Sequence, residues 1–529
     1  MISSYDIVIV GAGHNGLVCG AYLARAGLSV CVLERRGLIG GAAVTEELWP
    51  GYRLSTASYL MGLLQPKVML DLELQRHGLE ILVPPPLVQL QPDGRSIVFW
   101  GEEERLAREF APFSNADVVS YRAYRAHLRT LAPAVRQLMW SVPVDPTGRR
   151  PADLAALARF AWRNRGAMRH FYELFDLFTM SAYDYLGRWF ESDAAKVAIG
   201  FYAAGGGGGN AGFRTPGTAF ALTRSLLRDA DTPAGGPGFV KGGMGGISNA
   251  IAASGMAHGM QVRVDAPVAR VRIENGRASG VELADGEFIA ARAVVSNANA
   301  RTTFLRLVDE TALPASFRDH VGKAQAASTS YKVHLALSRL PRFAGFDAAR
   351  AGFTYPAQLR IAPSVDYMDD TYHLAQKGQL TESPYLTVMT PSVVDATLAP
   401  AGHHVMSIFG GHVPNAPEQG WDALRDTLYE RTIATLSAYA PDLRDCILHA
   451  QTLTPLDYER VFDLPGGHLQ HGEMSLNQMF FNRPAPHFAD HRTPVNGLYL
   501  CGAGAHPGGG VTGIPGHNAA GVIRSDLRR

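Results

Sequence analysis

The sequence predicts an α/β fold built on a parallel sheet, with a second, mixed α+β domain inserted into it. Three observations predict this class. Residues 5–10 form a short run that is apolar at nearly every position, as in the buried strands of a parallel sheet. A glycine-rich loop, a helical segment and a second apolar run follow and complete a β-α-β unit. Residues 497–529 repeat the order of strand, glycine-rich loop and helix, so both ends of the chain are expected to contribute to one domain.

The first β-α-β unit has clear boundaries. Residues 16–26 have helical character, and Gly27 ends the helix because glycine readily takes the left-handed conformation found after helices. Residues 28–33 are a second buried strand, and Glu34 stands at its end. The unit therefore has the length that a dinucleotide site requires.

The loop between the first strand and the helix is Gly11-Ala12-Gly13-His14-Asn15-Gly16, a GxGxxG pattern. Gly11 permits a tight turn, Gly13 lets a pyrophosphate approach the backbone, and Gly16 lets helix and strand pack closely. The phosphates then lie at the helix N-terminus, where free N–H groups and the helix dipole favour anions. Because Glu34 can accept hydrogen bonds from a ribose diol, the unit predicts a dinucleotide site.

The rest of the chain divides into helical and mixed parts. Mostly helical segments are expected over residues 84–226, and strands and turns are expected after them. The expected mostly helical segments include residues 121–139 and 151–186, and a further helix is expected at residues 247–255. The expected strands are residues 261–264, 269–274, 278–283, 291–296, 331–338 and 385–389, and the expected loops are residues 205–209 and 232–246. Asn275-Gly276 and Asp285-Gly286 are expected turns, the first of which closes a hairpin. Strands 331–338 and 385–389 alternate as half-buried strands do.

Composition argues against several function classes. The chain has 529 residues, is 47% hydrophobic and carries a formal net charge of +1, so it can bury a large core and shows no sign of a nucleic-acid partner. Its four cysteines form no CxxC pair, which argues against a metal site or a disulfide framework and favours a reducing compartment such as the cytoplasm. No signal peptide or presequence is expected before the first strand. No transmembrane helix is expected either, because the sequence has no uncharged apolar run of about 18 residues.

The segment that begins at Glu34 narrows the nucleotide to FAD. Its sequence is Glu34-Arg35-Arg36-Gly37-Leu38-Ile39-Gly40-Gly41-Ala42. The spacing from Glu34 to Arg36 and to the glycine pair resembles the FAD-binding extension of glutathione-reductase-like flavoproteins, which amine oxidases and phytoene desaturases share. In that class the paired glycines pass close to the pyrophosphate and the ribityl chain. Amine oxidases usually carry an arginine directly after the pair, whereas Ala42 and Ala43 resemble the phytoene desaturase branch.

The C-terminal glycine loop agrees with FAD. Residues 497–513 hold a strand and a glycine-rich loop, and a helix follows. In this family the N-terminus of that helix faces the flavin pyrimidine ring, where its N–H groups can stabilise the negative charge that builds at N1 and O2 on reduction. Many relatives hold the ribityl chain with an acidic residue just after the first glycine. Ala503 stands there in this chain, so that contact is lost or supplied by the backbone.

Nearly end to end, the chain resembles the phytoene desaturase-related FAD flavoproteins, with the desaturase-type carotenoid ketolases next. Matching stretches are residues 11–17, 39–47, 189–192, 241–245, 398–400, 464–467, 471, 474–476 and 502–518. The resemblance implies a glutathione-reductase-like Rossmann FAD-binding domain, discontinuous in sequence, with an inserted α+β substrate domain. The expected boundaries are 1–83, 232–297 and 493–529 for the FAD-binding domain, and 84–231 and 298–492 for the substrate-binding domain.

The resemblance also implies which residues contact FAD. They are Gly11, Gly13, His14, Asn15, Gly16, Glu34, Arg35, Arg36, Gly40, Gly41, Ala42, Val268, Gly502, Ala503, Gly510, Val511 and Thr512. Val268 is expected to contact adenine through its backbone, whereas His14 and Asn15 are expected to shape the phosphate loop.

Three residues are candidates for catalysis: Lys332, His471 and His506. Lys332 lies on a strand like the one that carries the lysine near flavin N5 in amine oxidases; the alternative is a lysine on a solvated strand face. His506 falls in the loop beside the flavin, where it either takes part in catalysis or braces the loop. His471 is expected to line the substrate cavity.

A basic and aromatic stretch lies between residues 149 and 171. Its members are Arg149, Arg150, Arg159, Trp162, Arg163, Arg165, Arg169 and Phe171. It fits an amphipathic surface in peripheral contact with anionic lipid, from which an apolar substrate would be delivered. The alternative, which the sequence favours, is a solvated helix face with its aromatic residues in the core.

The sequence therefore predicts a phytoene desaturase-like, FAD-dependent oxidoreductase that dehydrogenates or isomerises an apolar organic substrate, with hydride transfer to flavin N5. No second Rossmann unit is visible in the sequence, so oxygen or a quinone is the expected electron acceptor. Two alternatives stay open. One is a flavin amine oxidase. The other is a flavin-bound, non-catalytic escort protein, since Rab GDP-dissociation inhibitors share this fold without using flavin for chemistry.

Overall fold

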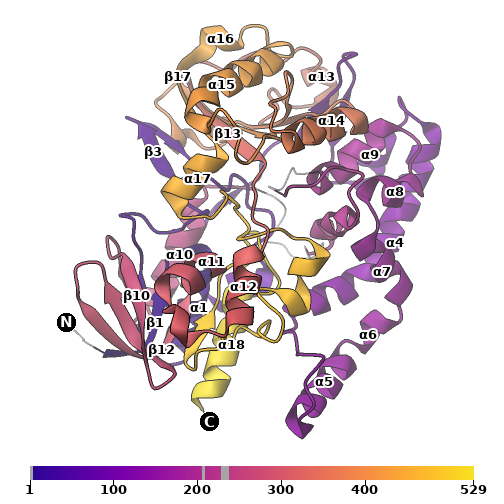
Figure 1. The fold of residues 1–529 in the computed structure, drawn as a ribbon. Coiled ribbons are helices and arrows are strands. Elements are labelled where there is room, and N and C mark those ends of the chain that lie inside the picture. The colour runs from indigo at the N-terminus through magenta and orange to yellow at the C-terminus, as the bar shows by residue number, and fades with distance from the viewer. Residues whose placement is uncertain (1–3, 205–208, 228–237, 529) are drawn as a thin grey trace.

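The computed structural model describes residues 4–204, 209–227 and 238–528. Two seven-stranded sheets organise those residues. In Figure 1 the first sheet lies in the lower half, the second lies at the top, and the helices of residues 115–200 lie along the right-hand side. The lower half combines indigo, rose and yellow ribbon, because it gathers segments from both ends and from the middle of the chain.

The first sheet has the strand order β10-β11-β12-β1-β2-β9, with β18 beside β12. Its strands are β1 (Ser4–Val10), β2 (Val30–Leu33), β9 (Gln261–Arg263), β10 (Val268–Glu274), β11 (Arg277–Leu283), β12 (Phe288–Ser296) and β18 (Leu498–Leu500). β18, β12, β1, β2 and β9 are parallel, whereas β10, β11 and β12 form an antiparallel meander. The predicted parallel strands are confirmed, and so is the hairpin turn, where Asn275 and Gly276 have φ of 50° and 74°.

The helices occupy the following ranges. They are α1 (His14–Arg25), α2 (Pro66–Asp71), α3 (Glu103–Glu109), α4 (Asn115–Trp140), α5 (Pro151–Arg163), α6 (Arg165–Met168), α7 (Phe171–Thr179), α8 (Ala182–Gly187), α9 (Asp193–Gly200), α10 (Gly245–Met256), α11 (Ala300–Thr302), α12 (Ala315–Lys323), α13 (Ala348–Ala351), α14 (Val365–Gln376), α15 (Trp421–Ser437), α16 (Leu443–Cys446), α17 (Pro455–Phe462) and α18 (Ile514–Leu527). The mostly helical segment expected over residues 151–186 contains four helices, α5, α6, α7 and α8. Of the expected loops, residues 205–208 and 232–237 lie outside the described residues.

Alternate residues of β1 enter two different cores. Ile7 and Ile9 pack in the cluster that also contains the buried residues of α1, α10 and α18. Val8 and Val10 point the opposite way, into a cluster that includes Phe304 and Phe317. Because successive side chains of a strand point to opposite faces, an unbroken apolar run is what a strand covered on both faces needs.

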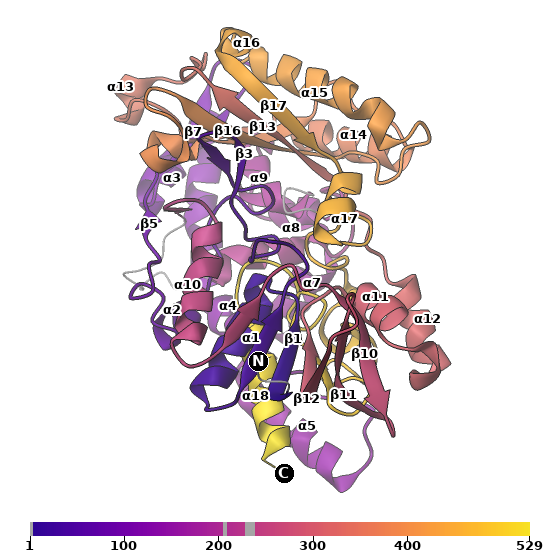
Figure 2. The same ribbon diagram turned by 90° about the vertical axis from the view of Figure 1, so that its left-hand side faces the viewer.

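The second sheet has the order β17-β13-β16-β15-β14-β6-β7. Its strands are β6 (Leu87–Leu90), β7 (Ser96–Phe99), β13 (Ser330–Leu337), β14 (Gln358–Ile361), β15 (Tyr385–Met389), β16 (His404–Gly411) and β17 (Ile447–Leu453). Only the β14–β6 pair is parallel within this described sheet. In Figure 2 this sheet lies above the first, with α15 over its upper side.

Two expectations about this sheet are wrong. β6 and β7 fall in the stretch expected to be mostly helical, where a turn at Asp93 and Gly94 instead pairs two short apolar strands. The alternation in β13 and β15 predicts half-buried strands, yet all of their residues are buried. On β13, the apolar residues pack with the core of α15, while Ala336 on the opposite face packs with β4 (Tyr52–Leu54).

The basic and aromatic stretch is exposed, not buried. Trp162 is 69% exposed and Phe171 is 49% exposed, and Tyr172 and Phe175 beside them are 80% and 55% exposed. The expectation that the aromatic residues lie in the core is therefore wrong for α5 and α7. Both helices lie at the edge of the molecule in Figure 1, where no sheet covers their outer sides.

Across the described residues, no helix is both long and apolar enough to cross a membrane. In the same ranges, no group of three or more His, Cys, Asp or Glu side chains is placed to hold a metal ion. All four cysteines are buried and free. The structure brings Cys19 and Cys501 together, a pairing that sequence spacing did not indicate, but burial raises the pKa of the Cys501 thiol and so opposes a reactive thiolate.

Candidate cofactor and substrate site

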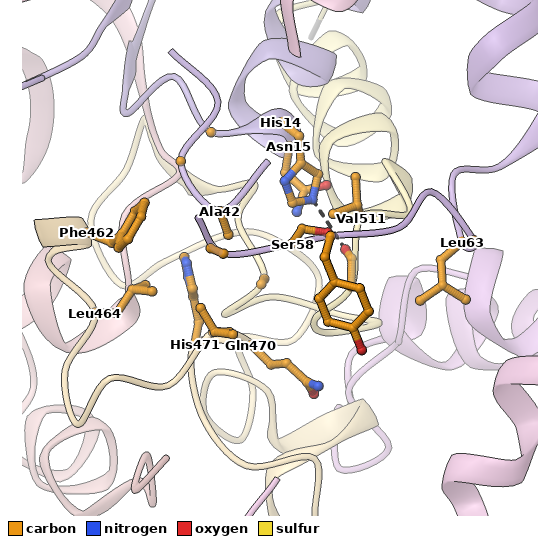
Figure 3. Close-up of a pocket in the computed structure, with 18 of the residues that line it drawn as sticks. His14, Asn15, Ala42, Ser58, Leu63, Phe462, Leu464, Gln470, His471 and Val511 are labelled. Atoms are coloured by element: carbon orange, nitrogen blue, oxygen red, sulfur yellow. Dashed lines mark hydrogen bonds between the residues drawn. The ribbon is translucent and has the colours of Figure 1, made fainter. Parts of the chain in front are cut away.

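A cavity of about 710 Å³ runs from the glycine loop of the first sheet to the second sheet. Figure 3 shows His14 and Asn15, at the start of α1, on the opposite side of this cavity from Gln470 and His471. One end is lined by the first β-α-β unit and by the start of β10, and the other end by aromatic and apolar residues from the helices and the second sheet. The cavity therefore joins the predicted nucleotide site to a second chamber.

The glycine loop has the close backbone contacts that its pattern predicts. Gly11 has φ of 95° and donates its N–H to the carbonyl of Leu33 at 2.7 Å. A Cβ at Gly16 would lie 2.4 Å from the Gly11 carbonyl oxygen, so only glycine fits there. Gly13 immediately precedes α1, whose first N–H groups lack partners within the helix. Asn15 adds a buried side-chain oxygen without a hydrogen-bond partner.

The paired glycines lie directly against this loop. The N–H of Gly40 donates to the carbonyl of Ala12 at 2.8 Å, and a Cβ at Gly41 would lie 3.2 Å from the Cα of Gly13. Gly13, Gly41 and Ala42 line the cavity, whereas Gly16 and Gly40 support it from behind. Bare backbone on both sides of a cavity at a helix N-terminus fits a pyrophosphate group.

Glu34 is fixed by two backbone hydrogen bonds at the nucleotide end. Its carboxylate accepts from the N–H of Ala12 at 2.9 Å and from the N–H of Arg36 at 3.0 Å. Only 7% of the residue is exposed, and it lines the cavity together with Val268. This placement leaves the carboxylate facing the position expected for a ribose diol.

The two arginines that follow Glu34 also line the cavity. Arg36 forms an ion pair with Glu46 and lies over the ring of Phe462, whereas Arg35 donates to the carbonyl of Val461. Protein groups therefore fix both guanidinium groups at the cavity wall.

The C-terminal loop closes the cavity opposite the glycine loop. Ala503, Gly510 and Val511 line it. His14 Nε2 lies 3.3 Å from the carbonyl oxygen of Gly510, which connects the two ends of the chain across the site. Gly502 and Thr512 do not line the cavity: a Cβ at Gly502 would lie 2.6 Å from the Asn297 carbonyl, and Thr512 accepts a hydrogen bond from the N–H of Ile514 at the start of α18.

Of the two candidate histidines, only His471 lines the cavity. Its Nδ1 is buried without a partner, and burial, followed by the charge of Arg483, lowers its pKa to about 3. His506 is 2% exposed, and its Nε2 lies 3.2 Å from the carbonyl oxygen of Leu138. Burial lowers the pKa of His506 to about 3 as well. Both rings are therefore neutral at physiological pH, and His506 occupies a bracing position.

Lys332 lies behind the cavity wall. It is fully buried, and its Nζ donates to the carbonyl of Ser55 at 3.0 Å. The same Nζ lies 4.9 Å from the ring centre of Tyr59, which lines the cavity. Burial holds the pKa of Lys332 well below its ordinary value. The alternative of a solvated strand face is wrong, and a role in catalysis stays a prediction.

The residues of the chamber at the second sheet were not predicted from the sequence. Its lining includes Tyr59, Phe99, Phe110, Tyr121, Tyr124, Tyr202, Leu222, Arg224, Arg360 and Phe409. These residues come from distant segments, and no local motif joins them. One available signal was Arg360, a lone cation within the buried strand β14.

Comparisons with known proteins show the family to which the chain belongs. Residues 16–348 match the model of the family described as flavin containing amine oxidoreductase. The chain is 36% identical to the rat pyridine nucleotide-disulfide oxidoreductase domain-containing protein 2 over 99% of this chain and 94% of the relative. It is 26% identical to one of the limonene dehydrogenase subunits of Castellaniella defragrans, over 99% and 95% of the two chains. Two bacterial lycopene-forming phytoene desaturases are more distant, at 25% and 24% identity.

A solved structure shows the same fold. Putrescine oxidase bound to putrescine superimposes with a TM-score of 0.61 at 19% identity, over 99% of each chain. The predicted resemblance to phytoene desaturase-related FAD flavoproteins is confirmed by the sequence relatives. At this identity the structural likeness concerns the fold alone.

Proposed function

Because the chain belongs to the flavin-containing amine oxidoreductase family, we propose that it dehydrogenates or isomerises an apolar organic substrate in the chamber beside its cofactor. The protein is an oxidoreductase, and FAD is its cofactor. The observation that carries the proposal is the single cavity, which joins a backbone-lined nucleotide end to an aromatic and apolar chamber.

We propose that FAD lies along this cavity in the manner of the glutathione-reductase-like flavoproteins. Gly11, Gly13 and Gly41 would hold the pyrophosphate, Glu34 the ribose, and Val268 the adenine. The C-terminal loop would hold the flavin end, with Ala503 offering only backbone contacts. In support, these residues line one continuous space, and added Cβ atoms at the supporting positions Gly16 and Gly40 would collide with backbone oxygens.

When bound, FAD supplies the acceptor for a hydride that leaves a substrate carbon. The chain's own part is to bind, orient and exclude water. The chamber wall offers rings such as Tyr59, Phe99 and Phe409, which pack against an apolar body. His471 is neutral and has an unpartnered Nδ1 at the cavity, so it can accept or donate one hydrogen bond to a substrate group there.

The amine oxidase alternative also has support, from the family and from the likeness to putrescine oxidase. The charges in the chamber oppose it. The only described acids that line the cavity are Glu34 and Asp463, at the nucleotide end, and Asp463 is paired with Arg306. Arg224 and Arg360 line the chamber instead, and they would repel a protonated amine.

Two further expectations stay proposals. Oxygen or a quinone would accept the electrons. The exposed aromatic residues and arginines of α5–α7 would place the protein on an anionic lipid surface, since rings with flanking arginines suit the membrane interface. An assay that compares binding to neutral and anionic vesicles, with Trp162→Ser as the variant, tests the second: equal binding to both vesicles would contradict it.

An anaerobic screen tests the proposed function. The purified yellow protein is mixed with polyenes, terpenoids and amines, and loss of the visible flavin band is followed together with product analysis. Bleaching by an apolar polyene or terpenoid, with a dehydrogenated or isomerised product, is the expected result. Bleaching by amines alone would establish the amine oxidase, and a flavin that no compound reduces would favour the escort protein.

A further inference from the structure

Two arginine side chains in the chamber have no acidic partner among the described residues. Arg360 lies on β14 and is only 6% exposed. Arg224 lies on the 3₁₀ segment η2 (Thr218–Leu226) and lines the same cavity. Within the part of the chain that the structure describes, neither guanidinium forms an ion pair with an Asp or a Glu.

The contacts of Arg360 hold its position without neutralising it. Its Nη1 donates to the carbonyl of Ala198 at 3.3 Å, and its Nε is buried without a hydrogen-bond partner. The guanidinium carbon lies 4.4 Å from the ring centre of Phe201 and 5.3 Å from that of Phe99. Rings and one carbonyl fix the side chain, but its charge stays uncompensated in a region of low dielectric.

The second arginine lies close to the first. The guanidinium carbons of Arg360 and Arg224 lie 4.8 Å and 5.9 Å from the ring centre of Tyr202. Burial lowers the pKa of Arg224, as expected for a cation that has lost water. Two like charges beside one ring repel each other, so a purely structural role explains their placement poorly.

A third arginine in the same wall provides an internal contrast. Arg125 also lines the cavity, but its Nε lies 3.6 Å from a carboxylate oxygen of Glu103. At the nucleotide end, Arg306 is likewise paired with Asp463. The unpaired arginines therefore belong to the chamber, next to the space where substrate would lie.

We propose that Arg224 and Arg360 bind a carboxylate at the end of an otherwise apolar substrate. The guanidinium group presents planar pairs of N–H donors that match a carboxylate. A carboxylate between the two arginines would offset the repulsion between their charges and give each guanidinium an anionic partner. The inference rests on the proposed function, because it names the substrate class of the same cavity.

Three probes with one carbon skeleton test this: citronellic acid, citronellol and citronellylamine. Each is titrated into the oxidised FAD-loaded protein at pH 8, and affinity is measured by calorimetry and by the shift of the flavin spectrum. We expect the acid to bind most tightly and the amine most weakly. Equal affinity for acid and alcohol, or a preference for the amine, would overturn the proposal.

Substitutions of the two arginines test whether these residues cause the preference for the acid. We expect Arg360→Met and Arg224→Gln each to weaken acid binding about 10-fold to 100-fold, with little change for the alcohol. Arg360→Lys keeps the charge without the planar donors and should recover part of the affinity. Arg188→Gln is the matched control, since Arg188 is exposed and paired with Asp176 outside the cavity wall. Acid preference that survives in both Arg360→Met and Arg224→Gln would contradict the assignment.

Binding measurements test the carboxylate site, whereas turnover tests the proposed function, so the two proposals can fail separately. Tight, arginine-dependent binding of the acid supports the carboxylate site even if the acid never bleaches the flavin. Bleaching by an uncharged apolar compound, without any acid preference, would leave the proposed function in place and overturn the carboxylate site.

Discussion

The two ends of the cavity recognise their ligands by different means. At the nucleotide end the chain offers backbone, namely Gly13, Gly41 and the N-terminus of α1, together with the carboxylate of Glu34. At the chamber end it offers side chains, namely aromatic rings and the arginines Arg224 and Arg360. The first end suits a ligand whose phosphates need N–H groups, and the second suits a ligand with an apolar body.

The difference also concerns how each end is built along the chain. The nucleotide end comes largely from one β-α-β unit, so its geometry follows from a short pattern of glycines. The chamber is assembled from η2, β14 and other separate elements, each of which contributes one or two side chains. A backbone site can thus be recognised locally, whereas a side-chain site exists only after the sheets have packed.

The largest effect is expected from a substitution that disrupts only the nucleotide end of the cavity. Gly13→Val places side-chain atoms where the pyrophosphate would approach, and its Cβ would lie 2.6 Å from Asn297 Nδ2. We expect folded protein without FAD, measured by the ratio of flavin to protein absorbance. Gly521→Ala, where an added Cβ meets nothing within 4 Å, is the control and should retain FAD. A yellow Gly13→Val protein would show that the pyrophosphate lies elsewhere.

The second-largest effect is expected from acid, which should lower the free energy of unfolding of the whole chain. Burial lowers the pKa of several described histidines, among them His14, His412 and His491 to about 4, and His471 and His506 to about 3. The unfolded chain takes up protons on them near pH 6.5, while the folded chain keeps them neutral. Stability is therefore full above pH 6.5 and is lost as the pH falls from there towards 4 and 3, by up to about 1.4 kcal/mol per pH unit for each histidine.

Urea unfolding of the apoprotein between pH 8 and pH 5 measures this loss. His471→Gln removes one titrating group, so its stability should fall less steeply with acid than that of the unchanged chain. A free energy of unfolding that is flat from pH 7 to pH 5 would contradict the burial of these rings.

A smaller effect is expected at the ribose contact. Glu34→Ala removes a carboxylate that would accept hydrogen bonds from FAD, and it also leaves the N–H groups of Ala12 and Arg36 without their acceptor. We expect the affinity for FAD to fall about 10-fold to 100-fold, as for a lost charged hydrogen bond. Titration of the apoprotein with FAD, followed by flavin fluorescence, measures it. Glu47→Gln, at an exposed carboxylate that accepts a hydrogen bond from the Gly51 N–H, should leave the affinity unchanged.

The smallest effect concerns Lys332, which lies behind the chamber. Lys332→Met replaces a buried amine with an apolar side chain of similar shape, and it removes one hydrogen bond to the Ser55 carbonyl. Because the change lies behind the chamber wall, FAD should stay bound. Stopped-flow reduction by a substrate should slow only several-fold, on the order of one lost hydrogen bond. Lys323→Met, at an exposed lysine paired with Asp319, is the control. An unchanged rate in Lys332→Met would remove this lysine from the mechanism.

Much of the nucleotide end could be predicted from sequence, and little of the chamber could. The strands β1, β2 and β12, the helix α1 and the turn at Asn275 follow from apolar runs and glycine positions that act over a few residues. The burial of β13 did not follow, because it depends on α15 and β4, which are remote in sequence. Arg360 was missed for the same reason: a lone arginine gains meaning only when β14 places it beside Tyr202.

Exposure of the aromatic stretch was mispredicted on similar grounds. The periodicity of α5 and α7 indicates an apolar face but cannot say whether another element covers it. In the structure Trp162 and Phe171 stay exposed. Tertiary contacts decide burial, and the sequence of one helix does not contain them.

A crystal structure of the FAD-loaded protein with citronellic acid directly tests whether one cavity holds the cofactor and the substrate at its two ends. We expect the pyrophosphate over Gly11–Gly16 and the flavin ring between His471 and the Ala503–Val511 loop, facing the aromatic chamber. A flavin ring that points away from the chamber, or a ligand bound outside this cavity, would contradict this arrangement.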